Sequence, residues 1–271
     1  MHVEEKSPMA IPLLVALAVF AAIGGAFVGS GALGGTPIKD AADGWLGADS
    51  TLVAPGTGAF VIWTFIYLGL AVYAVWQLGA TARSSPTQRI LRPLAAASAI
   101  LNALWLAVVQ LGWLGISVLV ILALLLVLIR IFMLLVQEPV VDLTERWIMW
   151  LTFGPYLGWV SVATVANMAA WLASLGVGSD AGWAQPLAAV LVVIAVLIGA
   201  ATVLYSRGRM SAALAMVWGI AWIGVGRSDG GTSSTIVAVT AFIGAGALLV
   251  FTVVAGVALT SRRKQMQEAQ P

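Results

Sequence analysis

The chain has 271 residues, of which 61% are hydrophobic and 9% are charged, and its mean hydropathy is +1.03. This composition excludes a water-soluble globular domain and predicts an all-α, polytopic membrane protein. The formal net charge is only +2, so nothing in the composition indicates a nucleic-acid partner.

Missing residue types restrict the chemistry further. The sequence contains no cysteine, and its one histidine is His2. Disulfides therefore cannot form, and thiolate metal sites and histidine-ligated haem inside the membrane lack ligands. We expect no metal and no required cofactor. No predicted span carries a lysine, aspartate or glutamate at its centre, which excludes a retinal Schiff base and an intramembrane proton relay. Without a conventional catalytic constellation, enzymatic activity is uncertain and disfavoured.

Long apolar segments predict about eight transmembrane helices, because about 20 residues are needed to cross about 30 Å of hydrocarbon. Lysine and arginine are distributed as the positive-inside rule requires, since with the N-terminus inside only Lys39 and Arg227 lie outside. We therefore predict a multi-pass protein of the cell membrane, surrounded by lipid, with both termini in the cytoplasm. The predicted helices are residues 9–29, 58–80, 93–112, 114–136, 148–175, 185–205, 210–226 and 235–260.

The first predicted helix, 9–29, follows two glutamates and lacks a clean cleavage site, so we interpret it as a retained helix and not as a signal peptide. Its Gly25 and Gly29 form a GxxxG pattern, which lets a second helix backbone approach closely and leaves a homodimer as an open possibility. The external loop that follows contains Trp45, which would either cover a pocket mouth or anchor the loop at the membrane interface.

The second and third predicted helices each combine aromatic and polar groups. The second presents Phe60, Trp63 and Tyr67 on one face, and the polar edges of Trp63 and Tyr67 need partners at membrane depth. In the third, Asn102 and Trp105 lie one turn apart, and Asn102 is the only strongly polar side chain in the middle of that span. We expect these side chains to face the protein interior and not the lipid.

The fifth predicted helix carries the most unusual stripe of the chain. Pro155, Trp159, Ala163 and Asn167 recur at every fourth residue and so share one helix face. Ala163 is small and leaves a hollow between larger neighbours. Because hydrocarbon offers no hydrogen-bond partner, the Asn167 amide must face protein or ligand. The stripe is therefore either the wall of a pocket or a helix–helix contact surface, and both interpretations stay open.

Together these segments resemble the TspO/MBR family of tryptophan-rich sensory proteins and translocator proteins, also called the peripheral benzodiazepine receptor family. In that family the second helix follows a Pro-Pro-Gly-like entry, the third carries Asn-x-x-Trp, and the fifth carries Pro-Tyr-x-x-Trp-x-x-x-Ala-Thr-x-x-Asn. Ala54 replaces the first proline of the entry. No tyrosine and basic residue follow closely after Asn167, and for this reason cholesterol binding is not predicted. The matching residues are Pro55, Gly56, Phe60, Trp63, Tyr67, Asn102, Trp105, Pro155, Tyr156, Trp159, Ala163, Thr164 and Asn167.

The resemblance implies a five-helix core over residues 1–176 with an intramembrane pocket for a tetrapyrrole such as a porphyrin. The chain resembles a divergent member of the family, and the resemblance ends past Leu175. Residues 177–271 then form a C-terminal extension of three helices with a short cytoplasmic tail, in which Trp218 and Trp222 either extend the pocket or pack against the core. The resemblance implies that the ligand-binding residues are Phe60, Trp63, Tyr67, Asn102, Trp105, Pro155, Tyr156, Trp159, Ala163 and Asn167.

A membrane receptor or sensor for a small, hydrophobic, planar ligand is the function that we predict from this resemblance. Two alternatives remain: a light-dependent porphyrin-degrading activity, in which Trp63 and Trp159 would mediate oxidation, and transport of a small amphipathic solute.

Overall fold

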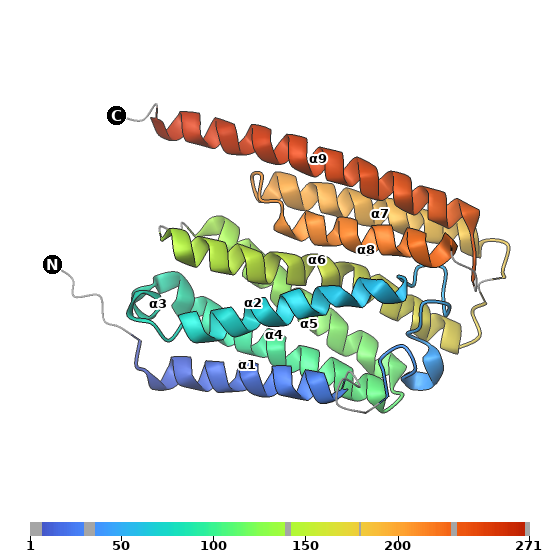
Figure 1. The fold of residues 1–271 in the computed structure, drawn as a ribbon, viewed down its shortest axis with the longest axis horizontal. Helices are drawn as coiled ribbons and strands as arrows, with labels where there is room; N and C mark the ends of the chain where they lie inside the picture. The colour runs from blue at the N-terminus through green and yellow to red at the C-terminus, as the bar shows by residue number, and fades with distance from the viewer. Residues whose placement is uncertain (1–6, 30–35, 139–141, 179, 229–231, 269–271) are drawn as a thin grey trace. The chain divides into compact units, whose positions relative to one another are not determined.

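The computed structural model describes residues 7–29, 36–138, 142–178, 180–228 and 232–268, and His2 lies outside these segments. Within them the chain is helical and forms no strand, which confirms the all-α prediction. The elements in chain order (Figure 1) are α1 Ala10–Gly29, the 3-10 helices η1 Ala42–Gly44 and η2 Thr57–Val61, α2 Ile62–Trp76, α3 Ala80–Ser84, α4 Pro86–Gln110, α5 Leu114–Gln137, α6 Leu143–Ser174, α7 Ala184–Tyr205, α8 Ser211–Ser228 and α9 Thr235–Glu268.

Seven of the described helices are long and apolar enough to cross a membrane, where α2 is counted together with η2. They are α1, α2, α4, α5, α6, α7 and α9. The chain is therefore a multi-pass membrane protein. Helix α8 lies where the seventh of the eight spans was predicted, but it has 18 residues, which at 1.5 Å per residue is about 27 Å. Its last residues, Arg227 and Ser228, are polar and lower its mean hydropathy, and it is not among the seven.

Two helices begin earlier than the sequence indicated. Helix α4 starts at Pro86, where residue 93 was predicted, and α6 starts at Leu143, where residue 148 was predicted. The apolar segments stopped at charged residues, but Arg92 and Glu145 are only 1% and 4% exposed. Their charges are accommodated by hydrogen bonds, so the helical backbone continues through them.

The chain divides into two compact units, one of residues 1–46 and 61–153 and the other of residues 47–60 and 154–271. These boundaries differ from the predicted division after residue 176. The reason is that the segment leading into α2 and the second part of α6 pack with the C-terminal helices. The assignment of residues 1–176 to one TspO-like domain stays a prediction.

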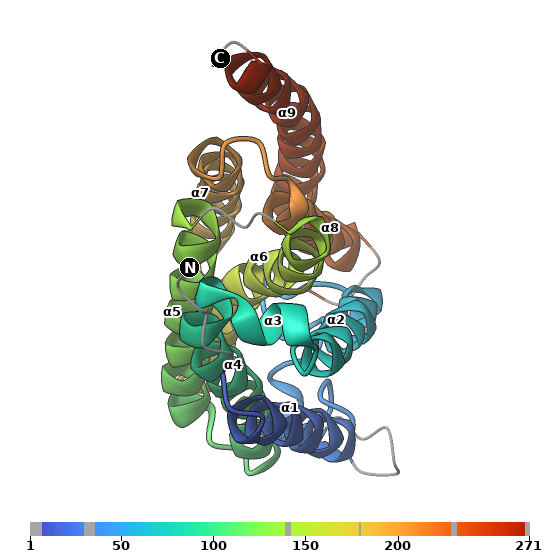
Figure 2. The same ribbon diagram turned by 90° about the vertical axis from the view of Figure 1, so that its left-hand side faces the viewer.

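In the first unit α4 is the central helix, because it lies against both α1 and α5, and α1 also contacts α2 (Figure 2). A Cβ built on Gly25 of α1 would lie 3.9 Å from the Cβ of Ala103 in α4. This glycine of the GxxxG pattern therefore lies near a helix of its own chain. The homodimer stays a prediction.

A buried polar network joins one end of the helices of the first unit. The Arg92 guanidinium donates to Gln77 Oε1 at 3.0 Å, to Ser7 Oγ at 3.1 Å and to the Ala82 carbonyl at 2.7 Å. Gln88 Nε2 in turn donates to Glu145 Oε1 at 2.8 Å. Gln77 is fully buried. The network holds the segment before α1 against α2, α3 and α4.

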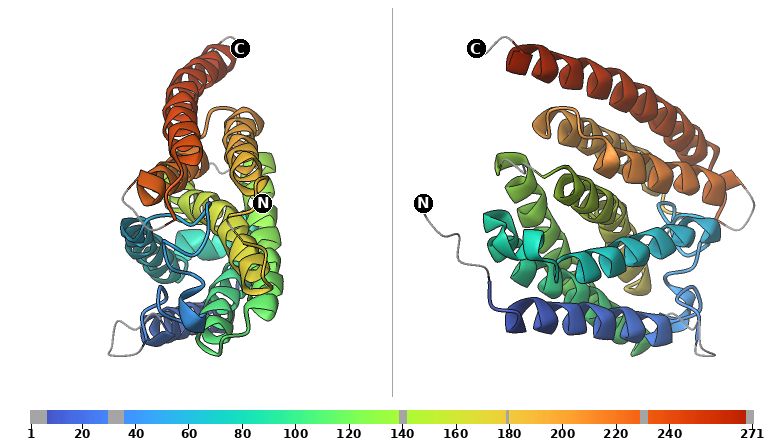
Figure 3. Two further views of the ribbon diagram at one scale, coloured as in Figure 1. Left: turned by 90° about the vertical axis from the view of Figure 1, so that its right-hand side faces the viewer. Right: turned by 60° about the vertical axis from the view of Figure 1, so that its left-hand side comes forward.

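In the second unit α7, α8 and α9 pack against one another (Figure 3, orange to red). Glycines make room for neighbouring side chains at their contacts. A Cβ on Gly199 of α7 would lie 2.6 Å from Leu248 of α9, and one on Gly224 of α8 would lie 2.9 Å from Phe242 of α9. Such close approach between helices is typical of membrane proteins. In lipid no hydrophobic effect drives helices together, and small residues allow the close van der Waals packing that does.

Arg227 at the end of α8 fixes the segment that precedes α2. It is 1% exposed, and its guanidinium donates to the carbonyls of Thr51 at 2.6 Å and Thr232 at 2.8 Å, and also to that of Ala48. Burial lowers the pKa of this guanidinium, and the Asp49 carboxylate opposes the shift. Arg227, which the sequence indicated only as an external charge, therefore has a structural role.

Candidate functional site

Four of the ten predicted site residues lie in the first unit, and three of them, Trp63, Tyr67 and Trp105, form an aromatic group. The Trp63 ring stacks on Tyr67 with centroids 5.4 Å apart and 19° between the planes, and on Trp105 with centroids 6.5 Å apart and 27° between the planes. Phe27 of α1 adds a tilted contact to Tyr67 at 6.1 Å. Trp63 and Trp105 are 8% and 5% exposed. These two tryptophans therefore face protein and not lipid, as predicted, whereas Tyr67 is only partly buried.

Asn102 supplies the polar part of this group. Its Nδ2 donates to the Tyr67 hydroxyl at 3.1 Å, and the residue is 2% exposed. Its Oδ1 is buried without a hydrogen-bond partner. A buried carbonyl oxygen without a partner is unfavourable, so the site presents one acceptor that a ligand N–H or O–H can use.

The other six predicted residues belong to the second unit. Tyr156, Trp159 and Asn167 of α6 are each at most 1% exposed, and Pro155 is also buried. Ala163 is partly buried, one turn beyond Trp159. The Phe60 ring meets Trp159 edge-on, with centroids 5.8 Å apart and 75° between the planes. The structure therefore brings the aromatic residue of the α2 entry to the tryptophan of α6.

The position of Phe60 depends on two tryptophans of α8. Trp222 lies against the entry segment: a Cβ on Gly58 would be 2.1 Å from its ring and one on Gly56 would be 3.0 Å from it. The backbone amide of Gly56 donates to the Trp222 carbonyl at 2.8 Å, and Trp218 Nε1 donates to the Ala59 carbonyl at 2.9 Å. Of the two roles open to these tryptophans, the structure shows packing.

The sequence did not single out the glycines of α6. A Cβ on Gly154 would lie 1.9 Å from Ser211 Oγ, and one on Gly158 would lie 2.1 Å from the Ala212 carbonyl oxygen. Val162, one turn further, contacts Gly219 of α8. The close helix–helix contact of α6 thus uses the stripe Gly154, Gly158 and Val162, one residue round from the stripe of Pro155 and Trp159. Their four-residue spacing was the available signal.

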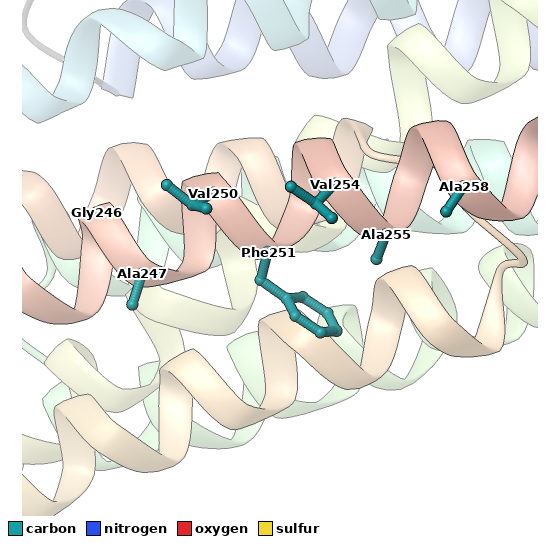
Figure 4. A pocket seen from close by; sticks show the side chains of 7 residues that line it. All are labelled: Gly246, Ala247, Val250, Phe251, Val254, Ala255 and Ala258. Atoms are coloured by element: carbon teal, nitrogen blue, oxygen red, sulfur yellow. The ribbon is translucent and has the colours of Figure 1, made fainter.

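A shallow depression of about 610 Å³ lies on α9, and all of its seven lining residues come from that one helix (Figure 4). Its side chains are hydrocarbon or aromatic, for example Val250, Phe251 and Val254. One exposed apolar face of a membrane helix needs no ligand to explain it, because lipid tails cover it.

No group of three or more histidine, cysteine, aspartate or glutamate side chains that could hold a metal ion occurs in the part of the chain that the structure describes. The expectation that no metal is bound stays a prediction.

The model of one protein family, described as TSPO-like protein, matches residues 12–254. The chain belongs to the TSPO-like protein family. The match continues well past Leu175, where the motifs that carried the resemblance end, so α7, α8 and most of α9 lie within the matched region. The expectation that the resemblance ends there is wrong. Neither the comparison with curated proteins nor that with solved structures found a match.

Membership of the TSPO-like family, together with the apolar helices, indicates a membrane sensor, receptor or transporter. The buried tryptophans and amides that carried the resemblance form two candidate groups, one in each unit: Trp63, Asn102 and Trp105 in the first, and Trp159 and Asn167 in the second.

Proposed function

We propose that this TSPO-like protein is a membrane receptor or sensor whose ligand is a planar tetrapyrrole. The observation that supports the proposal is the burial of Trp63, Trp105 and Trp159 together with amide groups, at positions where a lipid-facing helix would carry aliphatic side chains. Indole faces stack favourably on flat conjugated rings. The Asn102 oxygen without a partner would accept a hydrogen bond from a ring N–H.

Porphyrin titration of the purified protein tests this proposal, because a bound porphyrin quenches tryptophan fluorescence by energy transfer. Trp159→Phe reduces the aromatic area on which the porphyrin would stack. Ala163→Leu places a larger side chain one turn beyond Trp159, where it would take up space that the porphyrin needs. Aromatic pair contacts contribute about 0.5–1.5 kcal/mol beyond area burial, so we expect each variant to weaken binding of protoporphyrin IX by about two- to tenfold.

The matched control is Trp183→Phe, which removes an indole that is 56% exposed and outside both aromatic groups. It should leave the affinity unchanged while lowering the total fluorescence by a similar amount. An affinity that is the same in Trp159→Phe, Ala163→Leu and the unmodified protein would refute the proposed site.

The same proposal takes the predicted helix 210–226, which lies largely in α8, as an eighth crossing and places the chain in the cell membrane with both termini in the cytoplasm, on the basis of the lysine and arginine distribution. The natural absence of cysteine makes this testable with single-cysteine variants. Thr81→Cys should react with a membrane-impermeant maleimide only after permeabilisation, whereas Asp180→Cys should react in intact cells. Both residues are exposed. The opposite pattern would invert the orientation.

A further inference from the structure

A cavity lies within the second unit. Its volume is about 370 Å³, within the range of about 300–1,000 Å³ that is usual for small-molecule pockets. Its walls come from the segment 50–53, the last turns of α6 and the first turns of α7. None of the ten predicted site residues lines it.

Thr51 gives this cavity a polar group. The residue lines the cavity and is 6% exposed, and its hydroxyl is buried with no hydrogen-bond partner. Its carbonyl is held by Arg227 at 2.6 Å, so the backbone is fixed. The neighbouring Ser50 hydroxyl, in contrast, donates to the Gly47 carbonyl at 2.8 Å. A ligand in the cavity would meet this buried hydroxyl after Thr51 rotates about its Cα–Cβ bond to another staggered position.

The remaining lining is uncharged and almost entirely hydrocarbon, with Met168, Leu172 and Leu187 among the side chains. These three are 40–46% exposed, so the cavity opens on a surface that lipid tails can reach. Trp183, 56% exposed, stands at the end where α7 begins and is of the type that marks the membrane–water interface.

The chemistry of the ligand follows from what lipid already offers. Moving a hydrocarbon chain from the bilayer into an apolar cavity gains little, because the two environments are equally apolar. Selection therefore depends on the polar groups, and here these are the neutral hydroxyls of Ser50 and Thr51, of which that of Thr51 has no hydrogen-bond partner. A carboxylate or phosphate would enter without a cation among the lining residues and would be disfavoured.

We propose that this cavity binds an uncharged, long-chain lipid whose single hydroxyl group hydrogen-bonds to Thr51. The lipid enters sideways from the membrane past Leu172 and Leu187, and its hydroxyl end lies near the interface marked by Trp183. This site is independent of the tetrapyrrole proposal.

The experiment uses the full chain in lipid nanodiscs and a hexadecanol that carries a diazirine in its chain. After irradiation, mass spectrometry of peptides locates the covalent adducts. We expect adducts on the last turns of α6 and the first turns of α7. Thr51→Val removes the hydroxyl at nearly constant shape and should lower these adducts about three- to tenfold, the effect of losing one hydrogen bond. A diazirine-bearing hexadecane, which has no hydroxyl, should label the same peptides of the unmodified protein as weakly as the alcohol labels Thr51→Val.

Thr252→Val in α9 is the matched control. Thr252 is fully buried, its hydroxyl also has no hydrogen-bond partner, and it does not line the cavity. This variant should label like the unmodified protein. Equal labelling of Thr51→Val and the unmodified protein, equal labelling by the alcohol and the alkane, or an equal loss in Thr252→Val would each overturn the proposal. Porphyrin titration of Thr51→Val should be unchanged, which separates this result from the fate of the tetrapyrrole site.

Discussion

Replacing Gly58 by alanine tests whether Trp222 holds the entry to α2 in place. The added Cβ would lie 2.1 Å from Cη2 and 2.6 Å from Cζ2 of Trp222. Carbon atoms in contact are normally about 3.5–4.0 Å apart, so the indole or the segment must move by about 1.4 Å. Overpacking of this kind costs about 1–3 kcal/mol. Gly58 has no positive φ, so the penalty is steric and not conformational.

Unfolding of the purified protein in detergent, followed by circular dichroism during denaturant titration, measures this change. Gly246→Ala is the control, because a Cβ there meets no atom within 4 Å, and an alanine in a helix is expected to be neutral or to stabilise by up to about 1 kcal/mol relative to glycine. We also expect Gly58→Ala to weaken porphyrin binding, because Phe60 lies two residues further along the chain and its ring centroid is 5.8 Å from that of Trp159.

A double variant tests whether Trp222 causes this loss of stability. Trp222→Phe shortens the ring that blocks the new methyl group, so Gly58→Ala combined with Trp222→Phe should lose less stability than the sum of the two single changes. If Gly58→Ala is as stable as Gly246→Ala, or if the two effects simply add, Trp222 does not constrain the entry segment.

Three further variants test the other buried polar groups. Arg92→Lys cannot reproduce the guanidinium's three hydrogen bonds and should cost at least about 2 kcal/mol in the same unfolding assay; an unchanged midpoint would contradict the network. Tyr67→Phe removes the acceptor of the Asn102 amide and should cost about 1–3 kcal/mol, largely restored by adding Asn102→Leu, and no restoration would rule out that bond as the cause. Arg227→Met should speed amide hydrogen exchange in residues 47–53, and protection equal to that of the unmodified protein would mean that its bonds to the carbonyls there do not hold the segment.

The helices were predictable because their apolar length is a local property. The faces of the helices were predictable as well, since the period of 3.6 residues fixes which side chains share a side. Trp63, Asn102 and Trp105 were expected to turn inward because a lipid environment cannot satisfy their polar atoms, and all three are buried. The pairing of Asn102 with Tyr67 follows from the same demand, once α2 and α4 lie in one bundle.

What the sequence could not provide was the partner of each face. Gly58 and Trp222 are 164 positions apart, and nothing local indicates that one is small because the other lies on it. Arg92 was interpreted as a topology signal, because a charged residue near a predicted helix end is usually at the surface. Its burial depends on acceptors from three other segments, which only the folded chain brings together.

The packing of α8 changes which part of the chain supports the proposed site. Phe60 contacts Trp159 within one unit, and α8 supports both sides of that contact, Trp222 on the entry segment and Ala212 on Gly158 of α6. A five-helix core without α8 would lose both supports, although it would keep every residue of the family motifs. The C-terminal helices are therefore part of the structure that positions the predicted site, in agreement with a family match that continues to residue 254.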